Sequence, residues 1–193
     1  MTGRGAAGPV GPVPAGEDAE EYDRRRRRVL WSMPGGLYVL GTRAGTQRNL
    51  MTINWATQVA LEPKLVAVAV EGMARSHALL AEGGVFSLSL VSRADRALVR
   101  RFVKPVTEVE LDESGGRGTM QGEAVWLGPT GAPLLAAAVA WLDCAVRQRV
   151  ELGSHSLFVG EVVDCGFGPS GAPAQGARLE VLRMEDTRMN YGG

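Results

Sequence analysis

The sequence predicts a mainly β protein, a Greek-key split β-barrel with a few short helices. The chain has 193 residues with 26 glycines and 10 prolines, and so many turn-forming residues favour several short elements over a few long helices. Apolar and polar residues alternate over residues 51–59, which is the period of a strand with one buried face. Expected strands outnumber expected helices and do not alternate with them, which favours a barrel over a doubly wound sheet.

Charge and composition exclude several classes of protein. Lysine plus arginine number 21, and aspartate plus glutamate also number 21, so a generally nucleic-acid-binding or membrane-surface protein is not expected. No apolar run of about 18 residues is present to span a membrane. Only Cys144, Cys165, His77 and His155 could supply soft metal ligands, without the spacing of a zinc site. We therefore expect a cytoplasmic protein without a metal.

One folded domain, preceded by an N-terminal tail, is expected along the chain. Residues 1–28 form a Gly/Pro-rich and charged tail that we expect to be disordered. Within it, acidic residues 17–23 precede the run Arg24–Arg28, and opposite charges at helical spacing favour a short solvated helix. The role of the arginine run stays open. The folded domain then covers residues 29–193.

The expected elements of this domain follow from periodicity, glycine and proline. A short helix over 77–82 would begin at Ser76 as its N-cap and end at Gly83 and Gly84. A second helix would run from Ser92 to Val103, followed by a mobile loop over 106–122. The expected strands cover residues 37–42, 51–59, 65–70, 85–91, 136–152, 154–165 and 178–184.

One candidate anion site stands out after several familiar motifs are found to be absent. The sequence contains no dinucleotide-binding G-x-G-x-x-G after a strand, no P-loop and no G-x-S-x-G nucleophile motif. Arg75 can supply a bidentate cation, and the Ser76 hydroxyl and the first helix amides can supply neutral donors. The site would follow strand 65–70, and a phosphate there would leave the rest of a ligand free to lie along the polar face of the neighbouring strand 50–58, which carries Thr52 and Asn54.

The order of several segments resembles the flavin reductase-like FMN-binding family. The similarity covers about residues 29–191, and no single segment would be sufficient for it. The segments that carry it are 49–57 (NLMTINWAT), 62–70 (EPKLVAVAV), 75–77 (RSH), 84–88 (GVFSL), 141–144 (WLDC) and 153–163 (GSHSLFVGEVV), the last matching the family's G-D-H-T-L-F-x-G-x-V.

The resemblance implies a homodimeric barrel with one flavin in each subunit, FMN or alternatively FAD, and NAD(P)H as the electron donor. It implies that the isoalloxazine ring lies against one strand and the flavin phosphate against the start of the following helix. His155 would lie where the nicotinamide enters, as the catalytic candidate, and the C-terminal Tyr191 would close over the site. Ser154 stands where the family has an aspartate, and a serine orients the neighbouring histidine more weakly. The implied cofactor-binding residues are Met51, Thr52, Ile53, Asn54, Trp55, Ala56, Arg75, Ser76, His77 and Tyr191.

The expected function is that of an NAD(P)H-dependent flavin reductase that passes electrons to flavin or to a partner oxygenase. One alternative is an electron-transfer flavoprotein that holds FMN without turning over NAD(P)H. Another is a binding module in which the same barrel holds a different cofactor such as heme. A purely structural role for His155, as a turn residue at a hairpin tip, also stays open at this point.

Overall fold

The computed structural model describes residues 11, 13–112, 114–187 and 189, so the predicted contact of Tyr191 lies outside the described residues. The chain divides into two compact units, each described by itself: Met1–Pro34 with Met189–Gly193, and Gly35–Arg188.

The first unit contains helix α1, Ala19–Leu30. The Asp18 carboxylate caps it by accepting hydrogen bonds from the amides of Glu20 and Glu21. Asp23 pairs with Arg26 at 2.6 Å and also with Arg27 on the next turn. The charge pattern therefore forms the short helix that it indicated, which corrects the prediction of disorder over residues 19–28.

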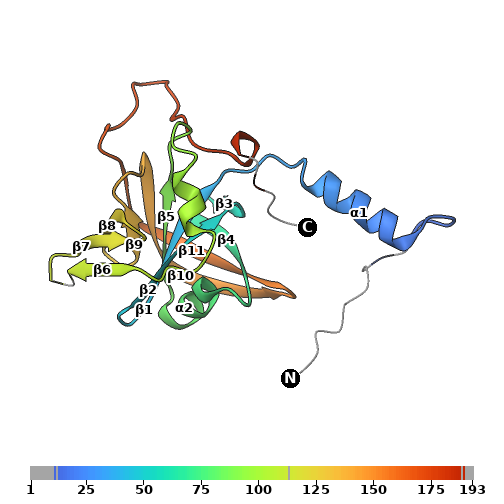
Figure 1. The fold of residues 1–193 in the computed structure, drawn as a ribbon, viewed down its shortest axis with the longest axis horizontal. Coiled ribbons are helices and arrows are strands. Elements are labelled where there is room, and N and C mark those ends of the chain that lie inside the picture. Colours follow the sequence, from blue (N-terminus) through green and yellow to red (C-terminus); the bar gives the residue numbers. More distant parts are fainter. Residues whose placement is uncertain (1–10, 12, 113, 188, 190–193) are drawn as a thin grey trace. The chain divides into compact units, whose positions relative to one another are not determined.

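The second unit is built on a seven-stranded antiparallel sheet (Figure 1). Its strand order is β2-β1-β5-β10-β11-β4-β3. Among the described residues, no pairing joins the two edge strands β2 and β3, so the sheet is not closed there. The strands are β1 (Tyr38–Ala44), β2 (Gln47–Ile53), β3 (Ala56–Ala60), β4 (Leu65–Glu71), β5 (Val85–Leu90), β10 (Ala140–Leu152) and β11 (His155–Phe167).

A second, four-stranded sheet has the order β6-β7-β8-β9. It comprises β6 (Val109–Asp112), β7 (Arg117–Met120), β8 (Glu123–Leu127) and β9 (Pro133–Leu135). The prediction of a mobile loop over 106–122 is therefore wrong, because β6 and β7 pair with each other and extend the hairpin of β7 and β8. The mainly β class is confirmed.

Helical segments of this unit are short. They are α2 (Arg75–Gly83) and the 3₁₀ turns η1 (Leu98–Phe102) and η2 (Met184–Asp186). Helix α2 packs on β1, and Gly83 permits this because a Cβ there would lie 1.7 Å from the Arg43 carbonyl oxygen. The helix predicted over 92–103 shrinks to η1, and the strand predicted over 178–184 is reduced to isolated bridges, one of them between Ser92 and Val181.

The strand predicted over residues 51–59 is broken at Asn54 and Trp55. Strand β2 pairs with β1, whereas β3 pairs with β4 on the opposite edge of the sheet, so the chain changes partner between them. The Trp55 carbonyl accepts a hydrogen bond from the Ala69 amide during this change. The predicted buried face is therefore wrong at its far end, where Trp55 is 41% and Val59 51% exposed.

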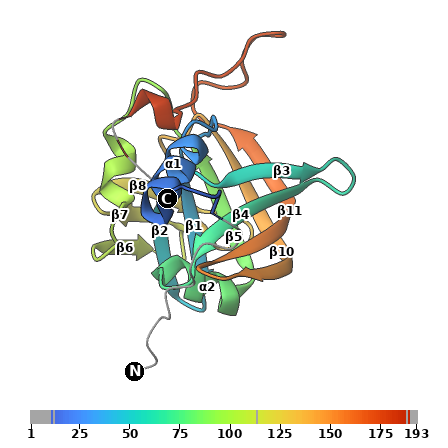
Figure 2. The ribbon, with the colours of Figure 1, turned by 90° about the vertical axis from the view of Figure 1, so that its right-hand side faces the viewer.

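The β10–β11 hairpin is confirmed as a pair of long strands joined at Gly153 (Figure 1). Gly153 has a φ of 78°, which a side chain would disfavour, and this turn pairs Leu152 with His155. Farther along the hairpin, Gly160 leaves room for the buried ring of Phe86. The two strands, side by side in Figure 2, carry Glu151, His155 and Ser156 near the hairpin tip.

Candidate active site

Three segments that are far apart in the sequence meet at the start of β11. The Trp55 ring, from the break between β2 and β3, lies 4.8 Å from the His155 ring at an interplanar angle of 57°. His77 in the first turn of α2 has its Nε2 2.8 Å from the Ser156 Oγ. The structure thus brings together residues from the predicted ring segment, the predicted phosphate segment and the histidine motif.

His155 is held from one side only. Its Nδ1 lies 2.9 Å from the Oγ of Ser154, and its ring is partly exposed beside Trp55. A hydrogen bond at Nδ1 leaves Nε2 as the ring nitrogen that can face a ligand. Ser154 therefore orients the histidine, through a neutral hydroxyl instead of a carboxylate.

His77 belongs to a chain of polar groups across the hairpin. The Ser156 hydroxyl donates a hydrogen bond to Glu151 Oε2 at 2.9 Å, and Arg149 pairs with the other carboxylate oxygen at 2.5 Å. Burial lowers the pKa of His77, the Arg149 charge lowers it further, and Glu151 opposes both. The hydrogen bond from Ser156 in turn lowers the pKa of Glu151.

Ser76 lies on the opposite side of the same helical turn and is fully buried. Its Oγ accepts a hydrogen bond from Asn49 Nδ2 at 2.9 Å and lies 3.3 Å from Thr42 Oγ1. The residue at the N-cap of α2 is Ala74, which makes no side-chain cap, so the prediction that Ser76 caps this helix is wrong. The Ser76 hydroxyl is directed into the protein, because Asn49 and Thr42 are buried polar groups that need a partner.

Arg75 has an exposed side chain that contacts the neighbouring loop. Its Nη1 donates to the Val106 carbonyl at 3.0 Å, while the Val106 amide donates to Asn49 Oδ1 at 3.0 Å. A guanidinium carries five N–H donors, so one contact to Val106 leaves others for an anion. Arg75 is thus placed to bind an anion while it holds the loop.

The predicted ring segment lies on an edge strand and at its end. Because β2 pairs only with β1 in the sheet, its outer edge is not covered by another strand. Thr52 and Ile53 are buried, and the Thr52 hydroxyl donates to the Val99 carbonyl at 2.5 Å. Met51, Asn54 and Ala56 are partly exposed. A ligand on this segment would therefore meet main chain and the side chains near the break, but not the Thr52 hydroxyl.

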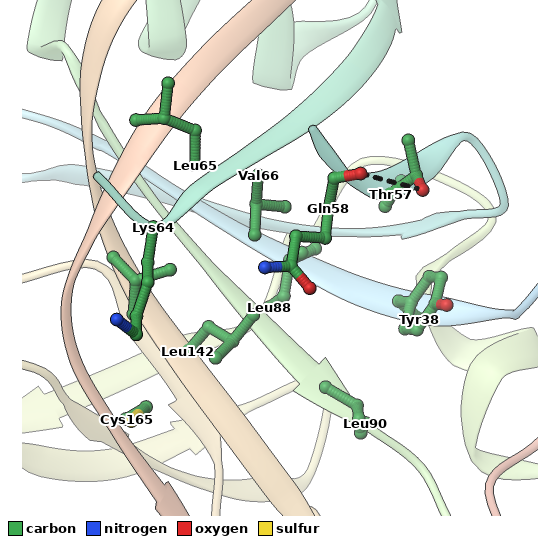
Figure 3. Close-up of a pocket in the computed structure, with 12 residues that line it drawn as sticks. Tyr38, Thr57, Gln58, Lys64, Leu65, Val66, Leu88, Leu90, Leu142 and Cys165 are labelled. Atoms are coloured by element: carbon green, nitrogen blue, oxygen red, sulfur yellow. Dashed lines mark hydrogen bonds between the residues drawn. The ribbon is translucent and has the colours of Figure 1, made fainter. Parts of the chain in front are cut away.

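A cavity of about 320 Å³ lies beside this segment, between β3 and the middle of the sheet (Figure 3). Its walls are mostly aliphatic, with the polar groups of Tyr38, Gln58, Lys64 and Cys165 among them. Of the predicted site residues, only Ala56 lines it. The cavity and the His77–His155 cluster are therefore distinct places that adjoin the same stretch of chain.

Sequence reasoning missed Asn49, Arg149, Glu151 and Ser156. Glu151 and Ser156 are directly opposite each other across the turn at Gly153, so counting outward from that glycine would have paired them. Asn49 carried no such signal, because its three partners come from β1, α2 and the loop at Val106.

Metal-binding clusters and membrane-spanning helices are both absent from the described part of the chain. It contains no group of three or more His, Cys, Asp and Glu side chains that could hold a metal ion. None of its helices combines the length and the apolar character needed to cross a membrane.

Comparison with known proteins identifies the family to which this chain belongs. The model of the flavin reductase like domain matches residues 30–181. A NADH-dependent FAD reductase of Streptomyces globisporus is 33% identical over 159 residues, which are 82% of this chain and 84% of the relative. The NADH-dependent flavin reductase StyB of Pseudomonas fluorescens is 32% identical over 123 residues, 64% of this chain and 65% of the relative.

Solved structures agree with the sequence comparison. The NADH:FAD oxidoreductase SgcE6 of Streptomyces globisporus superimposes with a TM-score of 0.64 at 30% identity, covering 84% of this chain and 87% of that one. The styrene monooxygenase flavin reductase of Pseudomonas putida S12 gives a TM-score of 0.61 at 28% identity, with 75% and 86% covered. The predicted family and its flavin reductase function are confirmed at this level, and the chain belongs to the flavin reductase-like domain family.

Proposed function

We propose that this protein is an NAD(P)H-dependent flavin reductase that binds FMN or FAD across the cluster of Trp55, His77 and His155. One observation supports the proposal most strongly. The predicted ring, phosphate and nicotinamide segments, which lie far apart in the sequence, meet within hydrogen-bond and ring-contact distance at the start of β11.

The residues present fit a flavin. The partly uncovered edge of β2 and the chain around Asn54 offer main-chain groups to the polar edge of the ring. Trp55 and His155 offer flat faces, and Arg75 offers spare donors for a phosphate. When bound, the flavin supplies the hydride chemistry.

The chain's own groups would bind and orient the reactants. His155, held at Nδ1 by Ser154, would present Nε2 to the nicotinamide carboxamide. Trp55 would exclude water from one side of the site, since its ring packs against the histidine. Holding the two reactants in a fixed orientation is the contribution that these residues would make to the rate.

The assembly belongs to the same proposal. We infer that the curved seven-stranded sheet is a split barrel, and that two copies form a homodimer in the cytoplasm. Reduced flavin would serve a partner oxygenase, an inference supported by two structural neighbours: the styrene monooxygenase reductase, and BorF, the flavin reductase component of a bacterial two-component tryptophan halogenase, which is 29% identical.

The test is a visible spectrum of the purified protein with added FMN or FAD, followed by NADH or NADPH without oxygen. Bleaching of the bound flavin by either nucleotide is the expected result. Flavin that binds but stays oxidised with both donors would favour an electron carrier. Absence of flavin binding would contradict the proposed site.

A further inference from the structure

Four side chains form a continuous polar chain over one face of the hairpin. Arg149 and Glu151 of β10 lie opposite Phe158 and Ser156 of β11, and His77 reaches them from α2. The Phe158 ring contacts both ends of this chain: its centroid is 5.5 Å from the Arg149 guanidinium carbon and 5.4 Å from the His77 ring centroid. Ser156 is 1% exposed, whereas the Glu151 side chain is 66% exposed, so the serine in the middle of the link is buried and the carboxylate at its end meets solvent.

Hydrogen-bond chemistry fixes the direction of this chain. A serine hydroxyl has one hydrogen, and that of Ser156 is donated to the Glu151 carboxylate. The contact with His77 must then run from the Nε2–H of the imidazole to the serine oxygen. With Nε2 engaged, Nδ1 is the ring nitrogen left for a ligand. It is an acceptor in the neutral ring and a donor only in the imidazolium.

We propose that Glu151 and Ser156 are positioning residues for His77, whose ring takes up a proton at Nδ1 when the flavin phosphate binds beside the first turn of α2. The inference rests on the proposed flavin-binding function. The proton comes from solvent, no electron is transferred, and the phosphate gains a charged N–H donor in addition to Arg75.

The surrounding charges explain why the carboxylate is needed. Burial disfavours a positive charge on the His77 ring, as does the Arg149 charge, and His155 adds the smallest effect in the same direction. Glu151 acts in the opposite direction, and through Ser156 it also holds the ring. Without Glu151, a cation at His77 would face two repulsive groups with no compensating charge.

Proton uptake is the most direct readout. Binding of FMN and of riboflavin is measured by calorimetry between pH 7.0 and 8.5 in buffers of different ionisation enthalpy, since a phosphate monoester has already lost its second proton there (pKa about 6). We expect the wild type to take up a proton with FMN and none with riboflavin, and its FMN affinity to fall as pH rises.

Single substitutions distinguish a role of Glu151 and Ser156 in positioning His77 from a general role in folding. Glu151→Gln keeps an oxygen for Ser156 and removes the charge, so the Kd for FMN at pH 7.5 should rise about three- to tenfold, with riboflavin affinity unchanged. Ser156→Ala should reduce proton uptake as His77→Ala does. Glu161→Gln is the matched control, because Glu161 is in a second ion pair of the same hairpin, 2.8 Å from Arg147.

The outcomes distinguish this inference from the proposed function. FMN binding by the wild type without proton uptake, or Glu151→Gln binding FMN as the wild type does, would overturn the inference and leave the flavin site standing. Proton uptake with NADH alone, and none with FMN, would also overturn it. A wild type that binds no flavin would contradict the proposed function itself.

Discussion

Two hydrogen-bond networks lie on opposite sides of the first turn of α2, and they differ in nearly every physical property. The inner network joins Ser76, Asn49, Thr42 and the Val106 amide, all inside the protein and without a charged side chain. The outer network joins His77 to Ser156 and Glu151, is partly open to solvent, and contains titratable groups. Ser76 and His77 are consecutive in one motif, yet Ser76 belongs to the inner network and His77 to the outer network.

The difference shows what each network can contribute. Every buried side-chain nitrogen and oxygen among the described residues has a hydrogen-bond partner, so the inner groups are satisfied within the protein and contribute to stability. The outer histidine is a group that can gain or lose a proton, and burial, followed by the Arg149 charge, lowers its pKa. We therefore propose the outer side, with His77 and the exposed Arg75, as the side that binds the ligand.

The largest effect is expected from breaking the inner network. Asn49→Leu removes the acceptor of the Val106 amide and the donor to Ser76. Buried groups left without partners cost about 1–3 kcal/mol each, so we expect the free energy of unfolding to fall by about 2–4 kcal/mol. Denaturant unfolding measures this. A variant as stable as the wild type would contradict the assignment of this network to stability.

Arg75→Ala tests the exposed residue that contacts Val106 and supplies the proposed phosphate-binding guanidinium. The variant loses a spare cation at the candidate phosphate site and one contact to Val106. A hydrogen bond to a charged group contributes roughly 1.5–3 kcal/mol, so the Kd for FMN should rise about tenfold or more, while riboflavin affinity changes little. Fluorescence titration with both flavins checks the prediction. Unchanged FMN affinity would remove Arg75 from the phosphate site.

The sequence predicted only part of the fold, and it did not predict that Ser76 and His77 belong to different hydrogen-bond networks. The mainly β class, the long hairpin at Gly153 and the family followed from local periodicity and from segments in order. The direction of Ser76 did not follow, because it depends on Asn49 and Thr42, which reach it through the tertiary fold. The exposed Trp55 was misjudged for a similar reason, since a change of strand partner interrupts the period-2 pattern there.

A smaller effect is expected at the outer edge of the site. Ser154→Asp replaces the neutral partner of His155 Nδ1 with a carboxylate, and charge-assisted hydrogen bonds are about twice as strong as neutral ones. We expect kcat/KM for the nicotinamide donor to rise roughly two- to fivefold, with no change in flavin affinity. Steady-state kinetics with NADH and NADPH measures it. An equal change with His155→Ala in the background would show that the aspartate acts elsewhere.

The smallest effect is expected at an ion pair that belongs to neither network. Arg147 and Glu161 face each other across the β10–β11 hairpin at 2.8 Å, but the arginine side chain is 60% exposed. Exposed pairs of this kind contribute about 0.2–1 kcal/mol, so Glu161→Gln should lower the free energy of unfolding by about 0.5 kcal/mol and leave the Kd for FMN unchanged. Denaturant unfolding measures the free energy of unfolding, and flavin titration measures the Kd.

Glu151 lies on the same hairpin as Glu161 and carries the same charge. A loss of FMN affinity in Glu161→Gln equal to that in Glu151→Gln would therefore mean that any negative charge on this hairpin acts on the flavin. A loss confined to Glu151→Gln would assign the effect to the link through Ser156 to His77.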